Sequence, residues 1–390
     1  MSISLAQQVM RRCDELAGIT DERGCITRTF HSPAMQRANK LVGRWMRDAG
    51  LSVREDAAFN LLGRLESSRR GAKTFLLGSH LDTVRNAGKY DGPLGVLLAV
   101  ACVEKLRASG VTLPFHLEIA GFSDEEGVRY QTTYLGSRAL VGTLTGKDLA
   151  TVTEKGIEKA RRKAGEFFGY AEAHIEQGPV LEARNRGVGV VTAIAGQSRI
   201  RVEWEGRAGH AGTTPMNLRQ DALCAAAELT LAARACGVIA TVGQMTVKPG
   251  ASNVIPAHVT MSLDVRHQSD ARRVAAVRKL QAQAKAIAKR CSVKLTWTIV
   301  QETNSVNCDP VLTNLLRKAA GKHEREVLTL PSGAGHDAAA ISVMCPVSML
   351  FIRCKDGLSH HPDESVKTAD VAKAVAVMSD FLVALKERHA

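Results

Sequence analysis

Apolar stretches of two kinds alternate along the first part of the chain and predict an α/β fold. Short runs at 74–78 and 115–122 have the length of buried strands, whereas the long apolar stretch at 94–107 predicts a helix. The pair Ser32-Pro33 marks the start of another helix, with a hydroxyl cap and proline at the first helical position. Strands that alternate with helices favour a mostly parallel sheet flanked by helices. Further strands are expected at 51–53, 60–65, 170–175 and 347–353, and further helices at 5–16, 310–320 and 369–386.

The pattern changes near Gly196 and predicts a second, inserted domain. From there the chain is expected to run strand, helix, strand, strand, helix, strand, which is the order of a ferredoxin-like α+β unit. We therefore expect an inserted domain over residues 196–306, and a discontinuous first domain made of residues 1–195 and 307–390. The elements expected in the insertion are strands at 197–205, 238–247, 253–266 and 293–300 and helices at 216–235 and 270–290.

Length and charge narrow the choice of partners. A chain of 390 residues is long enough for two domains with cores of their own. The net charge of +13 could mark a nucleic-acid binder, but the basic residues are spread along the whole chain and aromatic residues make up only 4%. We therefore expect no nucleic-acid partner and interpret the charge as a field that attracts a small anion.

The chain carries no sign of export or of a membrane span. No stretch approaches 18 uninterrupted apolar residues, and the first residues lack the basic and apolar regions of a signal peptide. Nine cysteines are dispersed without a Cys-x-x-Cys spacing, which is typical of reduced thiols rather than of a disulfide framework. The sequence therefore predicts a cytoplasmic protein without a membrane partner.

Side chains that can bind a metal follow several of the predicted strands. The loop after residues 74–78 offers His80, Asp82 and Asp91, at the end of a strand where an open α/β sheet forms its sites. Imidazole and carboxylate together suit a divalent metal, with Asp82 well placed to orient His80. An ordinary polar surface loop would explain this stretch as well, so the interpretation depends on the other strand ends. Those ends supply Glu125, Glu126, His174 and His360.

The number of these side chains favours two metals over one. Three imidazoles and up to three carboxylates from four strand ends are too many for a single structural zinc site. They suit two metals that share one carboxylate, because a second carboxylate is then left over as a base. Two metals about 3.5–4 Å apart can hold both an attacking water and the carbonyl group that it attacks. Nitrogen and oxygen ligands without thiolate are compatible with zinc, manganese, cobalt or nickel.

In two pairs of neighbouring residues, the two members of a pair are expected to have different roles. Glu125 and Glu126 cannot both point the same way on an extended strand, so one could bind metal while the other acts as general base. A glutamate pair that is simply solvated at a strand end is the commoner alternative. For His360 and His361 we expect one ligand beside one bystander.

Seven motifs, in order along nearly the whole chain, resemble those of the M20-type metallo-amidohydrolases. The similar subgroup contains the allantoate amidohydrolases, the N-carbamoyl-L-amino-acid hydrolases and the β-ureidopropionases. The stretches 86–91, 131–137 and 251–256 look most like the allantoate amidohydrolases. The seven motifs are Gly78-Ser-His-Leu-Asp82, Lys89-Tyr-Asp-Gly92, Phe122-Ser-Asp-Glu-Glu-Gly-Val-Arg129, His174-Ile-Glu-Gln-Gly-Pro179, Gly209-His-Ala-Gly-Thr-Thr-Pro-Met216, Ser332-Gly-Ala-Gly-His-Asp-Ala338 and Leu358-Ser-His360.

The resemblance implies a catalytic domain like that of the di-zinc exopeptidases, with two divalent ions per subunit. The ions would be manganese or zinc, with cobalt or nickel as alternatives. His80 and His174 would bind one ion, Glu126 and His360 would bind the other, and Asp91 would bridge them.

The resemblance also implies roles for residues that do not bind metal. Glu125 would be the general base, Asp82 would orient His80, and His210 would polarise the carbonyl group of the substrate. The glycine-rich turn at 333–335 offers backbone N–H groups at a helix start, which suit an anion. The expected substrate contacts are Gln177, His210, Asn253, Arg266, Gly333, Ala334 and Gly335.

The expected activity is hydrolysis of the ureido (carbamoyl) C–N bond of a small carboxylic acid, with allantoate as the substrate and ureidoglycine, ammonia and carbon dioxide as products. N-carbamoyl-L-amino-acid hydrolase and β-ureidopropionase activities are the alternatives. An M20 peptidase is disfavoured because His174 stands where many such peptidases place a carboxylate. A non-catalytic binding protein is disfavoured by the complete ligand set together with Glu125. The resemblance further implies a homodimer formed through the inserted domain.

Overall fold

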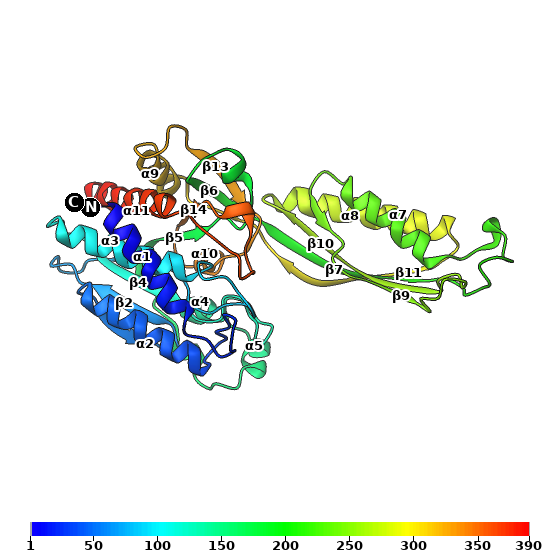
Figure 1. Ribbon diagram of the computed structural model, residues 1–390, viewed down its shortest axis with the longest axis horizontal. Helices are drawn as coiled ribbons and strands as arrows, with labels where there is room; N and C mark the ends of the chain where they lie inside the picture. Colours follow the sequence, from blue (N-terminus) through cyan, green and yellow to red (C-terminus); the bar gives the residue numbers. More distant parts are fainter. Residues whose placement is uncertain (1, 390) are drawn as a thin grey trace. The chain divides into compact units, whose positions relative to one another are not determined.

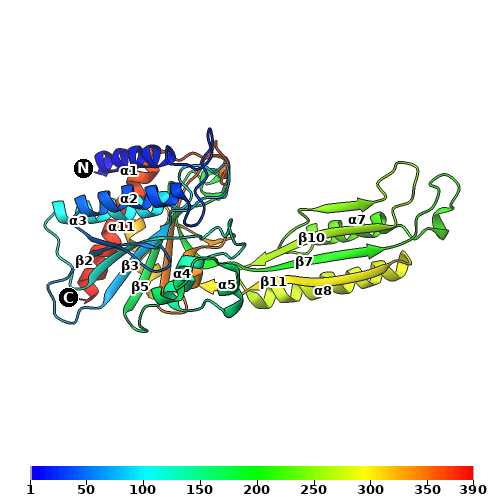
Figure 2. The ribbon, with the colours of Figure 1, turned by 90° about the horizontal axis from the view of Figure 1, so that it is seen from below.

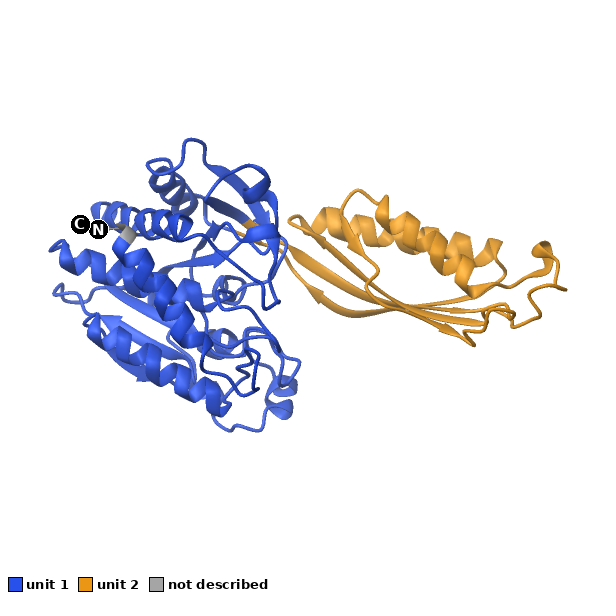
Figure 3. Cartoon of the chain, in the orientation of Figure 1, with its two compact units in different colours: residues 1–192, 308–390 blue, residues 193–307 orange. Residues whose placement is uncertain are grey.

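The computed structural model describes residues 2–389, and the chain forms two compact units (Figure 3). Unit 1 runs to Thr192 and resumes at Cys308, whereas unit 2 spans Ala193–Asn307. Among the described residues, no helix combines the length and the apolar character that a bilayer span requires.

Unit 1 is built on a mixed sheet whose strand order is β1-β2-β4-β3-β5-β14-β6-β12, with β13 paired to β6. The four central strands β4, β3, β5 and β14 are parallel, which confirms the predicted fold class. Strands in antiparallel pairing complete both edges of the sheet. The sequence did not predict this antiparallel pairing. The strands are β1 (Ser52–Glu55), β2 (Leu61–Leu65), β3 (Thr74–His80), β4 (His116–Phe122), β5 (Phe167–Ile175), β6 (Val188–Ile194), β12 (Val306–Asn307), β13 (Leu328–Ser332) and β14 (Val347–Ile352).

Helices pack against this sheet, and the first and last helices of the chain contact each other. Helices α1 (Ser2–Ala17), α3 (Pro93–Ala108) and α11 (Thr368–His389) contact one another, so the first and last helices lie side by side (Figures 1 and 2). Helix α3 also packs on β3, β4 and β5, and its uninterrupted apolar sequence fits that buried position. The other helices are α2 (Pro33–Asp48), α4 (Leu135–Val141), α5 (Gly146–Thr151), α6 (Val180–Ala183), α9 (Pro310–Ala320) and α10 (Asp337–Ile341), with short 3₁₀ turns at Ile157–Ala160 and Lys355–Gly357.

Two helix starts in unit 1 follow directly from local sequence. The Ser32 hydroxyl accepts a hydrogen bond from the backbone N–H of Met35 at 3.2 Å, and Pro33 occupies the first helical position of α2, as predicted. Asp309 caps α9 in the same manner, because its carboxylate accepts the backbone N–H groups of Val311 and Leu312 at 2.9 Å each. Side-chain caps therefore fix where both helices begin.

Unit 2 has the predicted order of elements, except that three strands rather than two lie between its two helices. Its antiparallel sheet has the strand order β11-β7-β10-β8, with β9 also paired to β10, and two helices pack against it (Figure 1). Buried Trp204, Leu229, Leu263 and Leu280 form part of its core. The elements are β7 (Gly196–Glu205), α7 (Ala222–Arg234), β8 (Ile239–Thr241), β9 (Met245–Lys248), β10 (His258–His267), α8 (Asp270–Arg290) and β11 (Lys294–Thr303), with a 3₁₀ turn at Met216–Leu218.

Three expectations about unit 2 were wrong in detail. The first helix begins at Ala222 rather than at Met216. The Asp221 carboxylate caps it there, because it accepts the backbone N–H groups of Leu223 and Cys224. The strand expected at 238–247 is two short strands, β8 and β9, separated at residues 242–244. Asn253 precedes β10 and lies in a turn, where the Val254 N–H donates to the Ala251 carbonyl at 3.3 Å.

Candidate metal centre and active site

Two neighbouring parallel strands deliver histidines to the same edge of the unit 1 sheet. His80 is the last residue of β3, and His174 is the penultimate residue of β5. Because β3 and β5 run parallel, their carboxyl ends meet at one edge, where α/β sheets form their sites. Both side chains are only 2% exposed.

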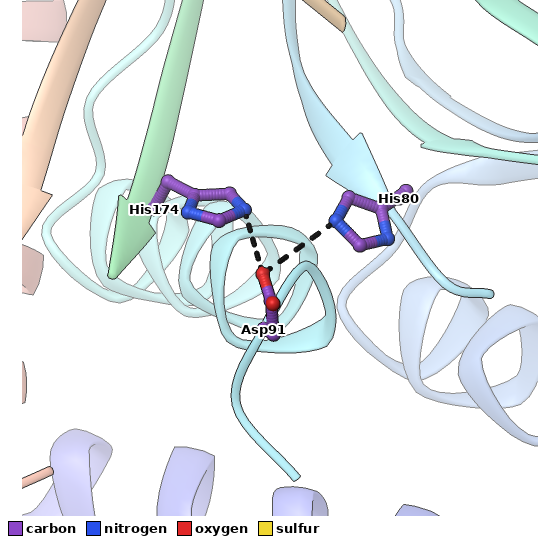
Figure 4. Close-up of side chains that lie close together, drawn as sticks. All are labelled: His80, Asp91 and His174. Carbon is purple, nitrogen blue, oxygen red and sulfur yellow. Dashed lines mark ion pairs between the residues drawn. The ribbon is translucent and has the colours of Figure 1, made fainter. Parts of the chain in front are cut away.

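Asp91 lies between these two histidines. It comes from the loop between β3 and α3, and both imidazoles point toward the same carboxylate oxygen (Figure 4). Asp91 Oδ1 is 3.1 Å from His174 Nε2 and 3.8 Å from His80 Nε2. The next residue, Gly92, has φ +81°, and a Cβ there would lie 2.4 Å from the His80 ring. Only glycine therefore lets the loop pass beneath His80.

The other oxygen of Asp91 faces a second pair of side chains. His360 Nε2 lies 3.1 Å from Asp91 Oδ2 and 3.2 Å from Glu126 Oε1. His80, Asp91 and His174 therefore form one group with ligand atoms within 4.8 Å of one another, while Asp91, Glu126 and His360 form another. Asp91 is the residue common to both groups, and each of its oxygens faces a different pair.

Glu125 and Glu126 are presented by a turn rather than by an extended strand, which corrects the premise used for the pair. Strand β4 ends at Phe122, and both backbone N–H groups donate to the buried Asp82 carboxylate, at 3.1 Å for Glu125 and 3.2 Å for Glu126. Asp82 thus fixes this turn with its side chain. Toward His80 it offers its backbone carbonyl, 3.1 Å from Nδ1, while its carboxylate lies 3.6 Å from the same atom.

The Asp91 cluster shifts the pKa values of its members in opposite directions. Burial alone would raise the pKa of Asp91, but the contacts with His174 and His360 outweigh burial and hold it well below its usual range. The pKa of His174 rises to about 9, because its contact with Asp91 outweighs the effect of burial. The pKa of His360 rises to about 10 through its contacts with Asp91 and Glu126. Without a metal, these two imidazoles carry protons at neutral pH.

Glu125 is set apart from the other carboxylates by its surroundings. Burial raises its pKa well above the usual range, and the charges of Glu126, Asp337 and Asp82 raise it further. Enzymes raise the pKa of a catalytic carboxyl group by burial and by neighbouring charges, and the direction of the Glu125 shift fits that of a general base. His80, Glu125 and Glu126 also form a group with ligand atoms within 4.8 Å of one another, and of the two glutamates it is Glu126 whose carboxylate contacts His360.

The donor atoms fit divalent metal ions. Asp91 Oδ1 is buried and accepts no hydrogen bond of good geometry from residues 2–389, although His174 Nε2 is close. An orphaned carboxylate oxygen facing two imidazoles is the arrangement that a cation would satisfy. The second nitrogen of His174 is 2.8 Å from the Ile175 carbonyl, which leaves Nε2 facing the centre. Imidazole and carboxylate without thiolate suit zinc or manganese.

Gln177 contacts the Asp91 cluster, whereas the glycine-rich turn forms a hydrogen bond of its own. The Gln177 amide donates to Asp91 Oδ2 at 2.9 Å and lies within 3.3 Å of the Ser359 hydroxyl, so this residue is part of the cluster. In the turn Gly333, Ala334 and Gly335, the N–H of Ala334 donates to the Ser332 hydroxyl at 3.1 Å. The helix that follows, α10, spans only five residues and supplies little dipole for an anion.

The other residues expected to bind substrate belong to unit 2. His210 and Asn253 are exposed and lie on neighbouring segments, because the Ala211 N–H donates to the Asn253 carbonyl at 2.9 Å. Arg266 lies near the end of β10, and its guanidinium contacts both oxygens of Asp264, at 2.9 and 3.2 Å. Within unit 2, the Arg266 side chain is therefore held by a carboxylate of its own strand.

Several residues of the site were missed in the sequence. Buried Glu364 and Ser359 contact the Asp91 segment, and the His336 ring lies 4.5 Å from that of His174. Glu172, His174 and His336 form a further group with atoms within 4.8 Å. The signal for Glu364 and Ser359 was their position in the same loop as His360, and the signal for His336 was its place in a quoted motif.

Comparisons with known proteins agree with this geometry. A model of the peptidase family M20/M25/M40 matches residues 76–384. Allantoate deiminase 2 of Glycine max is 38% identical, covering 97% of this chain and 89% of its own length. An N-carbamoyl-L-amino acid amidohydrolase of Geobacillus stearothermophilus is also 38% identical, covering 95% and 96%. The crystal structure of a hydantoinase/carbamoylase-family amidase from Burkholderia multivorans matches with a TM-score of 0.92 at 28% identity, covering 98% of each chain.

Proposed function

The chain belongs to the peptidase M20/M25/M40 family, and from that premise we propose that it is a two-metal amidohydrolase. The proposed reaction is hydrolysis of the ureido C–N bond of a small carboxylic acid. The observation that carries this proposal is the Asp91 carboxylate, whose two oxygens face two different sets of nitrogen and oxygen donors.

The proposed ligand sets use every side chain of the two groups around Asp91. His80 and His174 would hold one ion, Glu126 and His360 the other, and Asp91 would contact both. When bound, two divalent ions supply Lewis-acid polarisation of the ureido carbonyl and lower the pKa of the attacking water. Manganese or zinc fits the donor set, and cobalt or nickel would also be accepted.

The proton transfers fall to Glu125 in this proposal. It takes a proton from the water that attacks the carbamoyl carbon, and it returns that proton to the nitrogen that leaves when the C–N bond breaks. The carbamate that this leaves then loses carbon dioxide as its remaining C–N bond breaks, so the products are ammonia, carbon dioxide and the amine of the acid. The high pKa of Glu125 supports this role, because such a carboxyl group can both accept and return a proton.

Substrate recognition is proposed to involve both units. Gln177 and the turn at Gly333, Ala334 and Gly335 lie in unit 1. Arg266 is proposed to grip the substrate carboxylate through its planar guanidinium, with Asn253 beside it and His210 polarising the ureido carbonyl. The net charge of +13 would attract such an anion.

Allantoate is the proposed substrate, because relatives named allantoate deiminase, from Glycine max and other plants, are 36–38% identical over 97% of the chain. An N-carbamoyl amino acid is the second candidate, since a relative named N-carbamoyl-L-amino acid amidohydrolase is also 38% identical. We further propose a cytoplasmic homodimer formed through unit 2. The nine cysteines are all free, which supports a reducing compartment. Sedimentation at micromolar concentration tests the dimer, and a monomer would contradict it.

A substrate panel tests the proposed activity, with ammonia release measured for the ureido acids and release of free amino acids measured for the dipeptides. The panel consists of allantoate, N-carbamoyl-β-alanine, several N-carbamoyl-L-amino acids and dipeptides, each offered to metal-loaded and to chelator-treated protein. We expect ammonia from allantoate only with the metal-loaded protein. Preference for a carbamoyl amino acid would favour the second candidate, and cleavage of dipeptides alone would contradict the proposal.

A further inference from the structure

Buried Glu364 joins the loop that carries Asp91 to the loop that carries His360. The residue is only 3% exposed. Its Oε1 accepts two consecutive backbone N–H groups, from Tyr90 at 2.8 Å and from Asp91 at 3.0 Å. Its own N–H donates to the His361 carbonyl at 3.1 Å, so the loop after His360 folds back on itself to bring the carboxylate there.

The second oxygen of Glu364 reaches the side chain of Asp91 through one hydroxyl. Ser359 Oγ lies 2.9 Å from Glu364 Oε2 and 2.7 Å from Asp91 Oδ2. Glu364 therefore contacts the backbone of Asp91 directly and its carboxylate by way of Ser359. Both contacts limit where the carboxylate of Asp91 can point.

The fit between the two loops is close. A Cβ at Gly88 would lie 2.4 Å from the Cβ of Glu364 and 2.5 Å from Oε1. The Asp91 loop can therefore rest on the Glu364 side chain only because residue 88 is glycine. Such close packing leaves little room for the loop to move while Glu364 is in place.

We propose that Glu364 is a positioning residue for the metal centre. It holds the Asp91 carboxylate so that its two oxygens face the two ligand sets, and it keeps His360 in register with that carboxylate. The inference rests on the proposed function, because it assumes that Asp91 and His360 bind metal ions. Partners that orient a ligand in this manner typically contribute about 10–100-fold to metal affinity.

Replacing Glu364 by glutamine and by alanine separates hydrogen bonding from charge. In Glu364→Gln, the amide oxygen can accept the N–H groups of Tyr90 and Asp91, while the amide nitrogen donates to Ser359 Oγ. That hydroxyl can then donate to Asp91 Oδ2. Glu364→Ala removes all of these contacts and leaves two buried N–H groups without an acceptor.

Glu324 provides a matched control in the same unit. It is also buried, and its Oε1 accepts two consecutive N–H groups, from Gly187 at 2.7 Å and from Val188 at 3.3 Å. Its side chain also contacts Lys373 at 2.8 Å, and within residues 2–389 it contacts no proposed ligand. Glu324→Ala should lower thermal stability as Glu364→Ala does, without changing the metal centre.

The test is titration of chelator-treated protein with Co²⁺, following the visible absorption spectrum and the dissociation constant. We expect Glu364→Ala to bind Co²⁺ about 10–100-fold more weakly with an altered spectrum. Glu364→Gln should stay within about threefold of the wild type, and Glu324→Ala should match it in affinity and spectrum. If Glu364→Ala does not fold, Glu364→Asp replaces it, because the shorter side chain keeps the charge but cannot span both loops.

Three results would overturn the inference while leaving the proposed function intact. The first is a wild-type affinity and spectrum in Glu364→Ala, or in Glu364→Asp where that variant replaces it. The second is an equal loss in the glutamine variant, and the third is an equal loss in Glu324→Ala. Failure of the wild type to bind Co²⁺ would instead overturn the proposed function, and this inference with it.

Discussion

The two units present their candidate functional groups in contrasting ways. In unit 1, His80, Asp91 and His174 are at most 5% exposed and are held at strand ends and by hydrogen-bonded loops, while the His360 side chain is 49% exposed. In unit 2, His210 and Asn253 are exposed, and Arg266 contacts a carboxylate of its own strand. The contrast teaches that the side chains proposed to carry out the chemistry form a preorganised centre. The side chains proposed to recognise the substrate must still exchange their present contacts for contacts with it.

The largest expected effect comes from removing the residue that both ligand sets share. Asp91→Ala should lose both metal ions and all activity, because each of its oxygens faces a different set. Elemental analysis after gel filtration measures the loss. Asp363→Ala is the control, since this exposed carboxylate contacts His361 and, among the described residues, none of the proposed ligands. Two ions retained in Asp91→Ala would mean that the centre is not organised around this carboxylate.

The next effect separates chemistry from metal binding within unit 1. Glu125→Gln should keep the fold and the metal ions while kcat falls by about 10²–10⁴, the range for loss of a general base. Glu126→Gln should instead weaken metal binding, because the Glu126 carboxylate contacts His360. Steady-state kinetics and metal content measured on both variants decide the matter. The reverse outcome would exchange the two roles.

A smaller effect is expected in unit 2. Arg266→Lys should lower kcat/KM for the ureido acid by about a hundredfold, because a point charge cannot replace a bidentate guanidinium. Metal content and thermal stability should hardly change. Arg199→Lys is a matched control, since Arg199 contacts the same Asp264 carboxylate, at 3.4 Å. Equal losses in both variants would show that the effect comes from Asp264 and not from recognition.

A further expected effect is a pH dependence of metal binding. His174 and His360 have pKa values of about 9 and about 10 without metal, so both must lose a proton before an ion binds. Affinity should therefore rise with pH up to that range, by about tenfold per pH unit for each proton released. Calorimetry at pH 7 in buffers of different ionisation enthalpy should report about two protons released per chain. No proton release would contradict the assignment of these histidines.

The same pKa shifts predict how the metal-free protein responds to pH. Both pKa values lie above the usual 6.5 of histidine. The ion pairs between the protonated imidazoles and Asp91 therefore make their full contribution to the stability of the fold below about pH 6.5. This contribution decreases as the pH rises and is lost above about 10. Metal-loaded protein should lack this decline, because the ions replace the protons. Thermal unfolding of both forms between pH 6 and pH 10 measures the difference.

Much of the fold could be predicted because long patterns and caps act locally. Helices α8 and α9 have the predicted bounds, since each is a continuous helical segment with a clear start. Strand β6 was missed although it pairs with β14 at the antiparallel side of the sheet. The place of β6 in the sheet depends on strands that are distant in sequence. The local pattern of apolar residues therefore did not predict it.

The candidate site divides in the same way. Side chains that follow predicted strands, such as His80 and His174, could be found because parallel strand ends share an edge. Glu364 could not be found in this way, because it contacts Asp91 across 273 residues of sequence. The turn that presents Glu125 depends on the buried Asp82 carboxylate, and a sequence pattern does not reveal that contact.

The central claim is that one carboxylate, Asp91, serves two ions. Anomalous diffraction from crystals of the zinc-loaded protein tests it most directly. We expect two peaks about 3.5–4 Å apart, one against His80 and His174 and the other against Glu126 and His360, both in contact with Asp91. A single peak, or a peak held by Glu172 and His336 in place of Asp91, would contradict the account.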